Sequence, residues 1–216
     1  MSDQRPIRRA ASVIAARPGV GGPEVLVLQR GAESRFLPGY VVFPGGAVDG
    51  ADVALAERWF GDQREASRAA AVRELVEEAG LALTAGGLVD AGNPDSLDPT
   101  HEAPPSAAQL TEMAHWIAPE DVPVRFDARY FALAAPADLE PAPDGAEAEL
   151  AWWESPRSIL AGWAEGDRKL YWPTYLTMLH LAECGSVNDV LALRFETRDA
   201  DEAEVDSLPS SVFWED

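Results

Sequence analysis

The sequence predicts a single domain of the α/β or α+β class. Three observations support this prediction. Short apolar runs with strand character are interspersed with runs of helical spacing along the whole chain, 47% of the 216 residues are apolar, and neither a linker nor a repeat of fixed period divides the sequence. A chain of this length and apolar content can bury a substantial core. We therefore expect one domain over residues 1–195, followed by an acidic tail over 196–216.

Three strands are expected near the N-terminus. The runs at 10–18 and 24–31 are short, apolar and rich in strand-forming residues. The segment 18–23 between them is rich in Gly and Pro, which indicates a hairpin or a loosely connected pair of strands. A third strand over 40–46 ends in a sharp turn.

Two helices are expected next. The run 52–60 predicts a short amphipathic helix that Gly61 stops. The run 62–80 is the longest helical signal in the chain, with Asp62 as its N-cap and Gly80 as its C-terminal stop. Apolar side chains fall on one side of this helix, while an arginine and three glutamates lie on the rest: Arg73, Glu74, Glu77 and Glu78.

The second half of the chain predicts further mixed elements. We expect a loop over 84–105, a helix over 105–118, strands over 128–136 and 148–153, and helices over 155–166, 173–185 and 186–193. The tail from Glu196 is acidic and weakly periodic, which predicts an extended or partly disordered segment.

The charge balance excludes some classes of partner. The chain carries 17 Lys and Arg against 37 Asp and Glu, which argues against general nucleic-acid binding because that needs basic patches. Cys184 is the single cysteine, so no internal disulfide is expected. The sequence also has neither the apolar run of a membrane span nor the pattern of a signal peptide. We expect a cytoplasmic protein without membrane partners.

The glutamates of the long helix raise a chemical question. Residues at i, i+3 and i+4 share a helical face, as Glu74, Glu77 and Glu78 do. One interpretation is a solvated acidic face on which Arg73 pairs with Glu77. Another is a site for hard divalent cations such as Mg²⁺, which prefer carboxylate oxygens and bridge to phosphates. Spacing alone favours the solvated face.

A resemblance changes this weighting. The segment 73–81, with sequence RELVEEAGL, resembles the second half of the Nudix box, and the Phe-Pro-Gly-Gly turn at 43–46 resembles its opening. Glu65 stands eight residues before Arg73, where the pattern has its first glutamate. The leading glycine of the pattern would fall at Trp59, so we take Gly46 as that glycine. We therefore place the box at about 46–81, with an insertion over 50–62. The similarity extends from about residue 8 to 185.

The resemblance implies a fold and a set of site residues. The implied fold is a Nudix-type α/β/α sandwich with a mixed β-sheet, the long helix on one face and the helices near 107–117 and 173–184 elsewhere. The implied site binds Mg²⁺ or Mn²⁺ through three glutamates and a backbone carbonyl: Glu74, Glu77, Glu78 and Gly46. Arg73 would orient these carboxylates through ion pairs, and Glu74 and Glu77 are also expected to be catalytic.

A further acid is expected from outside the box. The family commonly recruits a glutamate shortly before a tryptophan-bearing strand, and the segment 144–156 resembles that region. Glu147 and Glu149 are the candidates for a metal ligand or general base, with Glu147 favoured over Glu149 and a solvated loop acid as the alternative for each.

The segment 28–46 is similar to the signature that precedes the Nudix box in coenzyme A pyrophosphatases. Arg30, Arg35 and Gly39 fall in register with that signature, whereas Gly31 departs from it. Planar guanidinium groups suit phosphate oxygens, so Arg30 and Arg35 are expected to bind substrate, with a surface ion pair as the alternative. Arg129 is a third candidate, for which a salt bridge to an aspartate is the stronger alternative.

The resemblance implies an enzyme that hydrolyses a diphosphate linkage in a nucleoside diphosphate joined to a second moiety, with the ion activating the attacking water. Coenzyme A or an acyl derivative is the preferred substrate. ADP-ribose, NADH or other nucleotides are the alternatives, as is a Nudix protein that senses nucleotides without turnover. Nudix enzymes of this size often pair, so the resemblance also implies a homodimer.

Overall fold

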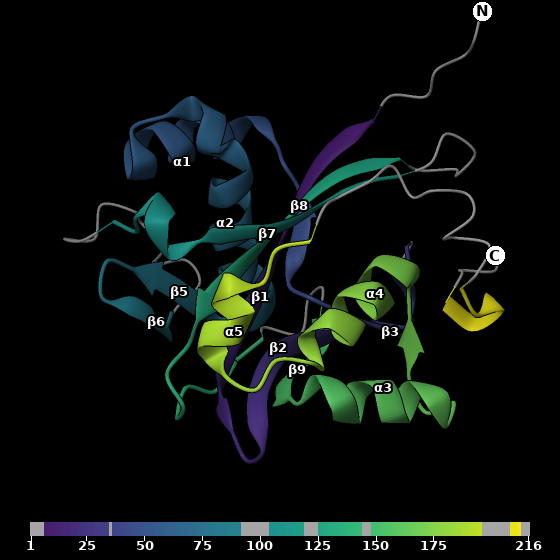
Figure 1. Cartoon of the computed structure of the whole chain (residues 1–216). Coiled ribbons are helices and arrows are strands. Elements are labelled where there is room, and N and C mark those ends of the chain that lie inside the picture. The colour runs from purple at the N-terminus through teal and green to yellow at the C-terminus, as the bar shows by residue number, and fades with distance from the viewer. Residues whose placement is uncertain are drawn as a thin grey trace, which may run out of the picture.

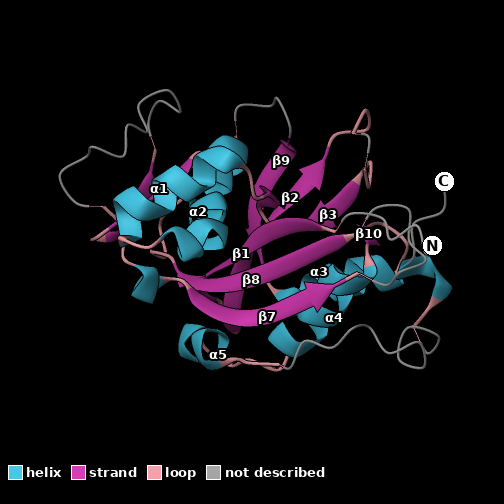
Figure 2. Cartoon of the chain, turned by 90° about the horizontal axis from the view of Figure 1, so that it is seen from above, coloured by secondary structure: helices cyan, strands magenta, loops and turns pink. Residues whose placement is uncertain are grey.

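A mixed β-sheet lies between two layers of helices in a computed structural model of the chain (Figure 1). The structure describes residues 7–34, 36–91, 104–118, 125–143, 148–195 and 208–212, with only the backbone for 148 and 149. Viewed from above, α1 (Gly50–Phe60) and α2 (Ala66–Ala79) lie on one side of the sheet, and the remaining helices lie on the other (Figure 2). This arrangement confirms the predicted α/β/α sandwich.

Eight strands of the described chain form the sheet. Its order is β10-β3-β2-β1-β8-β7, with β4 paired to β1 and β9 paired to β2. The strands are β1 (Arg8–Gly19), β2 (Gly22–Arg30), β3 (Tyr40–Val42), β4 (Gly45–Ala47), β7 (Thr111–Ile117), β8 (Phe126–Ala134), β9 (Ala148–Glu154) and β10 (Lys169–Leu170). A separate hairpin of β5 (Leu81–Thr84) and β6 (Gly87–Asp90) follows α2.

Strand β1 organises the sheet because it pairs with three neighbours. It runs parallel to β8 along Arg8–Ala16, and antiparallel to β2 at its far end. Near its start it pairs with β4, where Ala11 lies opposite Gly46 and Ser12 lies opposite Gly45. The glycine turn is therefore fixed beside the beginning of the central strand.

Alternation along β1 divides the core between the two helical layers. Val13 and Ala15 are completely buried against α2. Ile14 and Ala16 are equally buried on the opposite face, where α3 (Pro156–Ala164), α4 (Trp172–Leu181) and α5 (Val187–Ala192) pack. Successive side chains of a strand point to opposite faces, so this single strand joins both halves of the core.

The helix boundaries follow local hydrogen bonds. The Asp49 side chain accepts from the backbone of the first turn of α1, and the Asp52 side chain accepts in return from the Asp49 N–H, which forms a capping box. Asp62 caps a short 3-10 turn, η1 (Gln63–Glu65), so α2 begins at Ala66 rather than at 62. Gly80 ends α2 with a left-handed φ of 66°, a conformation that glycine adopts without steric cost.

The helix expected over 105–118 is wrong. The structure has one 3-10 turn there, η3 (Ala107–Gln109), followed by the edge strand β7. Leu110, Met113, Ala114 and Ile117 have the i, i+3, i+4, i+7 spacing of a helix. A β-bulge between Glu112 and Ala114 breaks the two-residue alternation of the strand and buries both Met113 and Ala114. The bulge therefore produces a helical spacing in a strand.

One other expectation was partly wrong, and another lies mostly outside the described residues. The loop expected over 84–105 begins inside the β5–β6 hairpin, and residues 92–103 lie outside the described residues. Most of the tail over 196–216 also lies outside them, but 208–212 includes the 3-10 turn η4 (Ser210–Val212), which packs near β10. Val212 is completely buried, so this turn contributes an apolar side chain to the core. In the described part of the chain, helices are too short or too polar to span a membrane.

Candidate functional site

Two buried glutamates of α2 contact the glycine turn over 43–46, which leads into β4. Glu78 accepts a hydrogen bond from the Gly45 N–H at 2.8 Å. Glu74 approaches Gly46 so closely that a Cβ added at Gly46 would lie 2.2 Å from its Oε1. The exposed fractions of Glu74 and Glu78 are 6% and 3%, so both carboxylates are held in the interior against this turn.

Arg73 lies among the acids of two helices. Its Nη1 is 2.8 Å from Glu74 Oε1 and 2.6 Å from Glu77 Oε2, and its Nε donates to Asp52 Oδ1 at 2.9 Å. Its Nη2 donates to the Ala47 carbonyl at 3.1 Å. Burial by itself lowers the pKa of Arg73, but the hydrogen bond to Asp52 and the charges of Glu74 and Asp52 outweigh it and raise the pKa above its ordinary value. The guanidinium is therefore a permanent cation that fixes α1, α2 and β4 together.

The oxygen atoms around α2 suit a hard divalent ion, but the three glutamates are each engaged with protein groups. Carboxylate and carbonyl oxygens are the ligands that Mg²⁺ prefers. Glu74 and Glu77 pair with Arg73, while Glu78 holds Gly45. Among the described residues, no three acids, histidines or cysteines are grouped to hold a metal ion. Glu77 is the side chain with room to move, because 53% of it is exposed.

A pocket of about 480 Å³ opens beside the same glycine turn. Arg30 stands at this junction: its Nε donates to the Phe36 carbonyl at 3.0 Å, and its Nη1 lies 4.0 Å from Glu78 Oε1. Aromatic and small residues from β1, β7, β8 and the start of α4 form much of the lining, which includes Gly45, Gly46, Phe36, Trp116, Phe126 and Trp172. The arrangement can receive an anionic group next to the buried glutamates and a ring-shaped group beyond it.

Comparison with known proteins identifies the family. The family model described as NUDIX domain matches residues 6–172. The chain belongs to the Nudix family. It is 33% identical over 168 residues to a Caenorhabditis elegans protein named putative nudix hydrolase 7, an alignment that covers 71% of this chain and 53% of that relative. The chain thus spans about half the length of the curated relative it matches.

A solved Nudix structure has the same fold. The crystal structure of the NUDIX hydrolase from Alicyclobacillus acidocaldarius superimposes with a TM-score of 0.76 at 28% sequence identity. The match covers 88% of this chain and 97% of that one. Nudix hydrolases generally use divalent metal ions, which agrees with the oxygen donors around α2.

Asp52 is the site residue that sequence reasoning did not assign. We gave the first acid of the Nudix box to Glu65, but Glu65 pairs with Arg68. Asp52 instead occupies the position beside Arg73 and is completely buried. Asp52 stands six residues after Gly46, which is the G-x5-acid spacing of the box counted from the correct glycine. That spacing was a usable signal.

The remaining predicted substrate residues lie in different surroundings. Arg129 forms an ion pair with Glu112 of β7, with both carboxylate oxygens 2.9 Å from its Nη1. Its neighbour Ala128 lines the pocket and Arg129 does not, so Arg129 faces the other side of β8. Arg35 and Glu147 lie outside the described residues, as does the Glu149 side chain.

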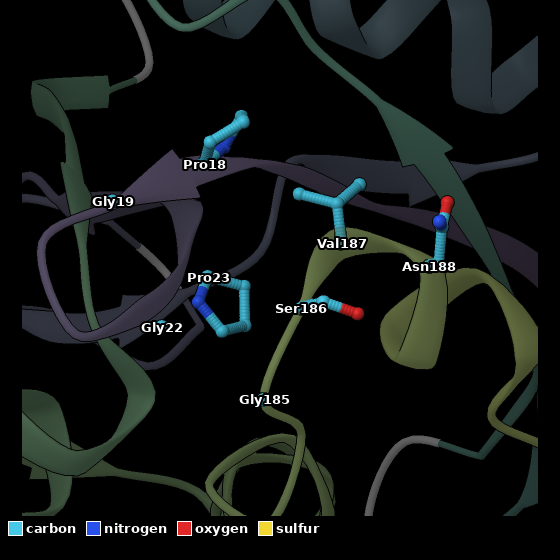
Figure 3. Close-up of a pocket in the computed structure, with 8 residues that line it drawn as sticks. All are labelled: Pro18, Gly19, Gly22, Pro23, Gly185, Ser186, Val187 and Asn188. Carbon is cyan, nitrogen blue, oxygen red and sulfur yellow. The ribbon is translucent and has the colours of Figure 1, made fainter.

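A second hollow lies far along β1 from this site. It has a volume of about 390 Å³ and is formed where the β1–β2 turn faces the start of α5 (Figure 3). Its lining consists of Pro18, Gly19, Gly22, Pro23, Gly185, Ser186, Val187 and Asn188. None of these described side chains carries a charge, so they offer no group for acid–base or phosphate chemistry.

Proposed function

We propose that this chain is a hydrolase that cleaves a diphosphate linkage in a nucleoside diphosphate joined to a second moiety, with coenzyme A or an acyl derivative as substrate. The observation that carries the proposal is the contact of Glu74 and Glu78 with the Gly45–Gly46 turn, beside Arg30 and the mouth of a pocket. Family membership and the name of the curated relative support the chemistry.

Glu74, Glu77 and Glu78 would hold Mg²⁺ or Mn²⁺, together with the Gly46 carbonyl. A divalent ion at this position supplies charge neutralisation of the diphosphate and activation of water for attack on phosphorus. Glu77 would turn away from Arg73 to join the other two glutamates, which its exposure allows. Arg73 would keep its bonds to Asp52 and Ala47 and so hold the backbone of the turn in place.

Arg30 would bind the diphosphate from the pocket side. Its Nε donates to the Phe36 carbonyl, which fixes the plane of the guanidinium, and its Nη1 lies 4.0 Å from Glu78 Oε1. A planar guanidinium suits phosphate oxygens. In a chain with a formal charge of −20, such a local cation is needed to offset repulsion of an anionic substrate.

The test is hydrolysis of a substrate panel with Mg²⁺ or Mn²⁺, followed by identification of the products. We expect coenzyme A to give adenosine 3′,5′-bisphosphate and 4′-phosphopantetheine, and chelation of the metal to stop the reaction. Cleavage of ADP-ribose, NADH or a dinucleoside polyphosphate without cleavage of coenzyme A would refute the substrate. Binding of nucleotides without turnover of any of them would refute the reaction and favour a nucleotide sensor.

Variants connect the reaction to these residues. We expect Glu78→Gln and Glu77→Gln each to lower kcat by about 100-fold or more, because each removes a charged ligand of the ion. Glu57→Gln is the matched control, since Glu57 is an exposed glutamate of α1 outside the site. Circular dichroism spectra would show that the variants are folded. Full turnover in the Glu77→Gln/Glu78→Gln double variant would contradict the assignment.

A further inference from the structure

Five aromatic rings form a connected series around the pocket. Phe126 contacts Phe36 with ring centroids 5.9 Å apart, Phe36 contacts Tyr171 at 6.1 Å, and Tyr171 contacts Trp172 at 6.1 Å. Trp172 then meets Trp116 edge to face at 5.4 Å. All five residues line the pocket, and they come from β7, β8, the β2–β3 loop and the start of α4. We refer to these five residues as the aromatic collar.

The pocket also carries charge of one sign. Among the described residues that line it, the charged ones are Arg8 and Arg30, and none is an acid. Within the described part of the chain, Arg8 forms no ion pair with a carboxylate. In a chain with more than twice as many acids as bases, this composition indicates a pocket for a ligand with anionic groups at two places.

Strand geometry separates the two arginines. Arg8 is three residues before Ala11, which lies opposite Gly46 at the glycine turn. At about 3.3 Å per residue, Arg8 starts roughly 10 Å along β1 from that turn. Arg30, at the end of β2, lies near Glu78, which accepts a hydrogen bond from Gly45 of that turn. The aromatic collar lines the same pocket, so it can contact a ring on a ligand that reaches both arginines.

Alternation of β1 directs Arg8 and its neighbour to opposite faces. Arg8, Ala10 and Ser12 lie on one face of β1 and line the pocket, together with Ala11 of the other face, whereas Arg9 is not among the described residues that line it. Arg9 points to the α2 face, where its Nη2 donates to Ser67 at 3.0 Å. Two adjacent arginines of the same charge thus differ in their access to the pocket, and Arg9 is in addition bonded to Ser67 of α2.

We propose that the aromatic collar stacks against the base of a nucleoside diphosphate substrate, and that Arg8 binds a further phosphate carried by the ribose of that nucleoside. This inference rests on the proposed function, since Arg30 and the glutamates would hold the diphosphate. The rings of the collar are inclined at different angles. A flat base can stack face to face on one of them and contact others edge to face. An acyl chain would fit the collar too, but it would leave Arg8 without a partner.

The experiment compares two nucleotides that differ by one phosphate. Adenosine 3′,5′-bisphosphate and AMP are titrated into the full chain by calorimetry at a fixed low salt concentration, without substrate turnover. We expect the bisphosphate to bind about tenfold more tightly or better, as one charge-assisted contact provides. Arg8→Gln is expected to bring the ratio of the two dissociation constants close to one, while Arg9→Gln, the matched control, leaves it unchanged.

Collar variants separate stacking from charge. Tyr171→Leu and Trp116→Leu are expected to weaken both nucleotides by about tenfold and to leave their ratio intact, because the lost contact is with the base. Two variants are used so that one failure to fold does not decide the result. If instead they reduce only the advantage of an acyl derivative of coenzyme A over coenzyme A itself, the collar holds the acyl chain and the inference is wrong.

The outcomes for the inference and for the proposed function differ. Preference for the bisphosphate that depends on Arg8, together with inactivity toward every diphosphate, would refute the reaction and leave the phosphate site standing. Hydrolysis of coenzyme A with equal binding of the two nucleotides, or with a ratio that Arg8→Gln does not change, would overturn the inference alone.

Discussion

The buried pair of Asp52 and Arg73 gives a sharp test of how the site is held together. Asp52 is completely buried, and its two oxygens accept from Arg73 at 2.9 and 3.2 Å. The substitution Asp52→Asn keeps the size of the side chain but removes its charge. It also turns one acceptor into an N–H₂ donor, which would face the guanidinium or the Asp49 N–H.

The magnitude follows from burial. Breaking a buried ion pair by removing one partner costs about 3–5 kcal/mol. Arg73 keeps its contacts with Glu74, Glu77 and Ala47, and 20% of its side chain is exposed, so we expect a smaller cost, about 2–3 kcal/mol. For a chain of this length each kcal/mol lowers Tm by about 2–4 °C. The expected decrease is therefore about 4–12 °C.

The assay is urea unfolding and thermal melting of the wild type, Asp52→Asn and Glu77→Gln. Glu77 contacts the same arginine but is half exposed, so its loss is expected to cost less than about 1 kcal/mol. A double-mutant cycle with Arg73→Met isolates the pair, and we expect a coupling of about 2 kcal/mol. If Asp52→Asn stays within about 0.5 kcal/mol of wild type, or matches Glu77→Gln, burial does not set the strength of this pair and the reasoning fails.

Four further variants test other contacts. Gly46→Ala is expected to lower Tm less than Gly45→Ala but to lower kcat by at least about 100-fold, because its Cβ would meet the carboxylate of Glu74 first and would displace that group of the proposed site. Gly45→Ala would place its Cβ 2.4 Å from a backbone oxygen of β1 and is expected to cost about 2–4 kcal/mol in unfolding experiments; equal behaviour of the two variants would contradict both statements. Gly80→Ala is expected to cost at least about 2 kcal/mol, since φ is 66° and its Cβ would meet a backbone oxygen at 2.3 Å; an unchanged urea midpoint would count against this. Burial raises the pKa of Glu154, but hydrogen bonds from Arg168 and two other side chains outweigh it and hold the pKa below 4.5. Its contribution to stability is then complete above that pH and is lost as pH falls through the lower folded value, so Glu154→Gln is expected to cost about 1–2 kcal/mol at pH 7 and progressively less below pH 4.5; a difference independent of pH would be evidence against this assignment.

Local signals in the sequence predicted most elements correctly. The N-terminal strands, α1, α2 and the three C-terminal helices follow from apolar spacing and from the glycines that end α1 and α2, Gly61 and Gly80. Strand β7 was missed because a bulge gives Met113 and Ala114 the same burial. A bulge depends on how the neighbouring strand pairs, which spacing along a single strand does not encode.

In the candidate site too, some residues were predicted from the sequence and others only from the folded structure. The glutamates of α2 and the glycine turn were recognised from short motifs, since each motif lies within one continuous segment. Asp52 was not assigned, although it is six residues after Gly46, because Glu65 has the expected spacing before Arg73. Only the folded chain distinguishes the two acids, because α1 turns back and brings Asp52 to Arg73 while η1 directs Glu65 to Arg68.

The sequence by itself determined the α/β class, the family resemblance and the three glutamates on one helical face, because these depend on residue type and on spacing along the chain. Tertiary structure alone decided which acid pairs with Arg73, which of two adjacent arginines reaches the pocket, and which five aromatic residues surround it. The physical reason is that these contacts join segments far apart in the chain, and their geometry is set by strand register and helix packing rather than by local preference.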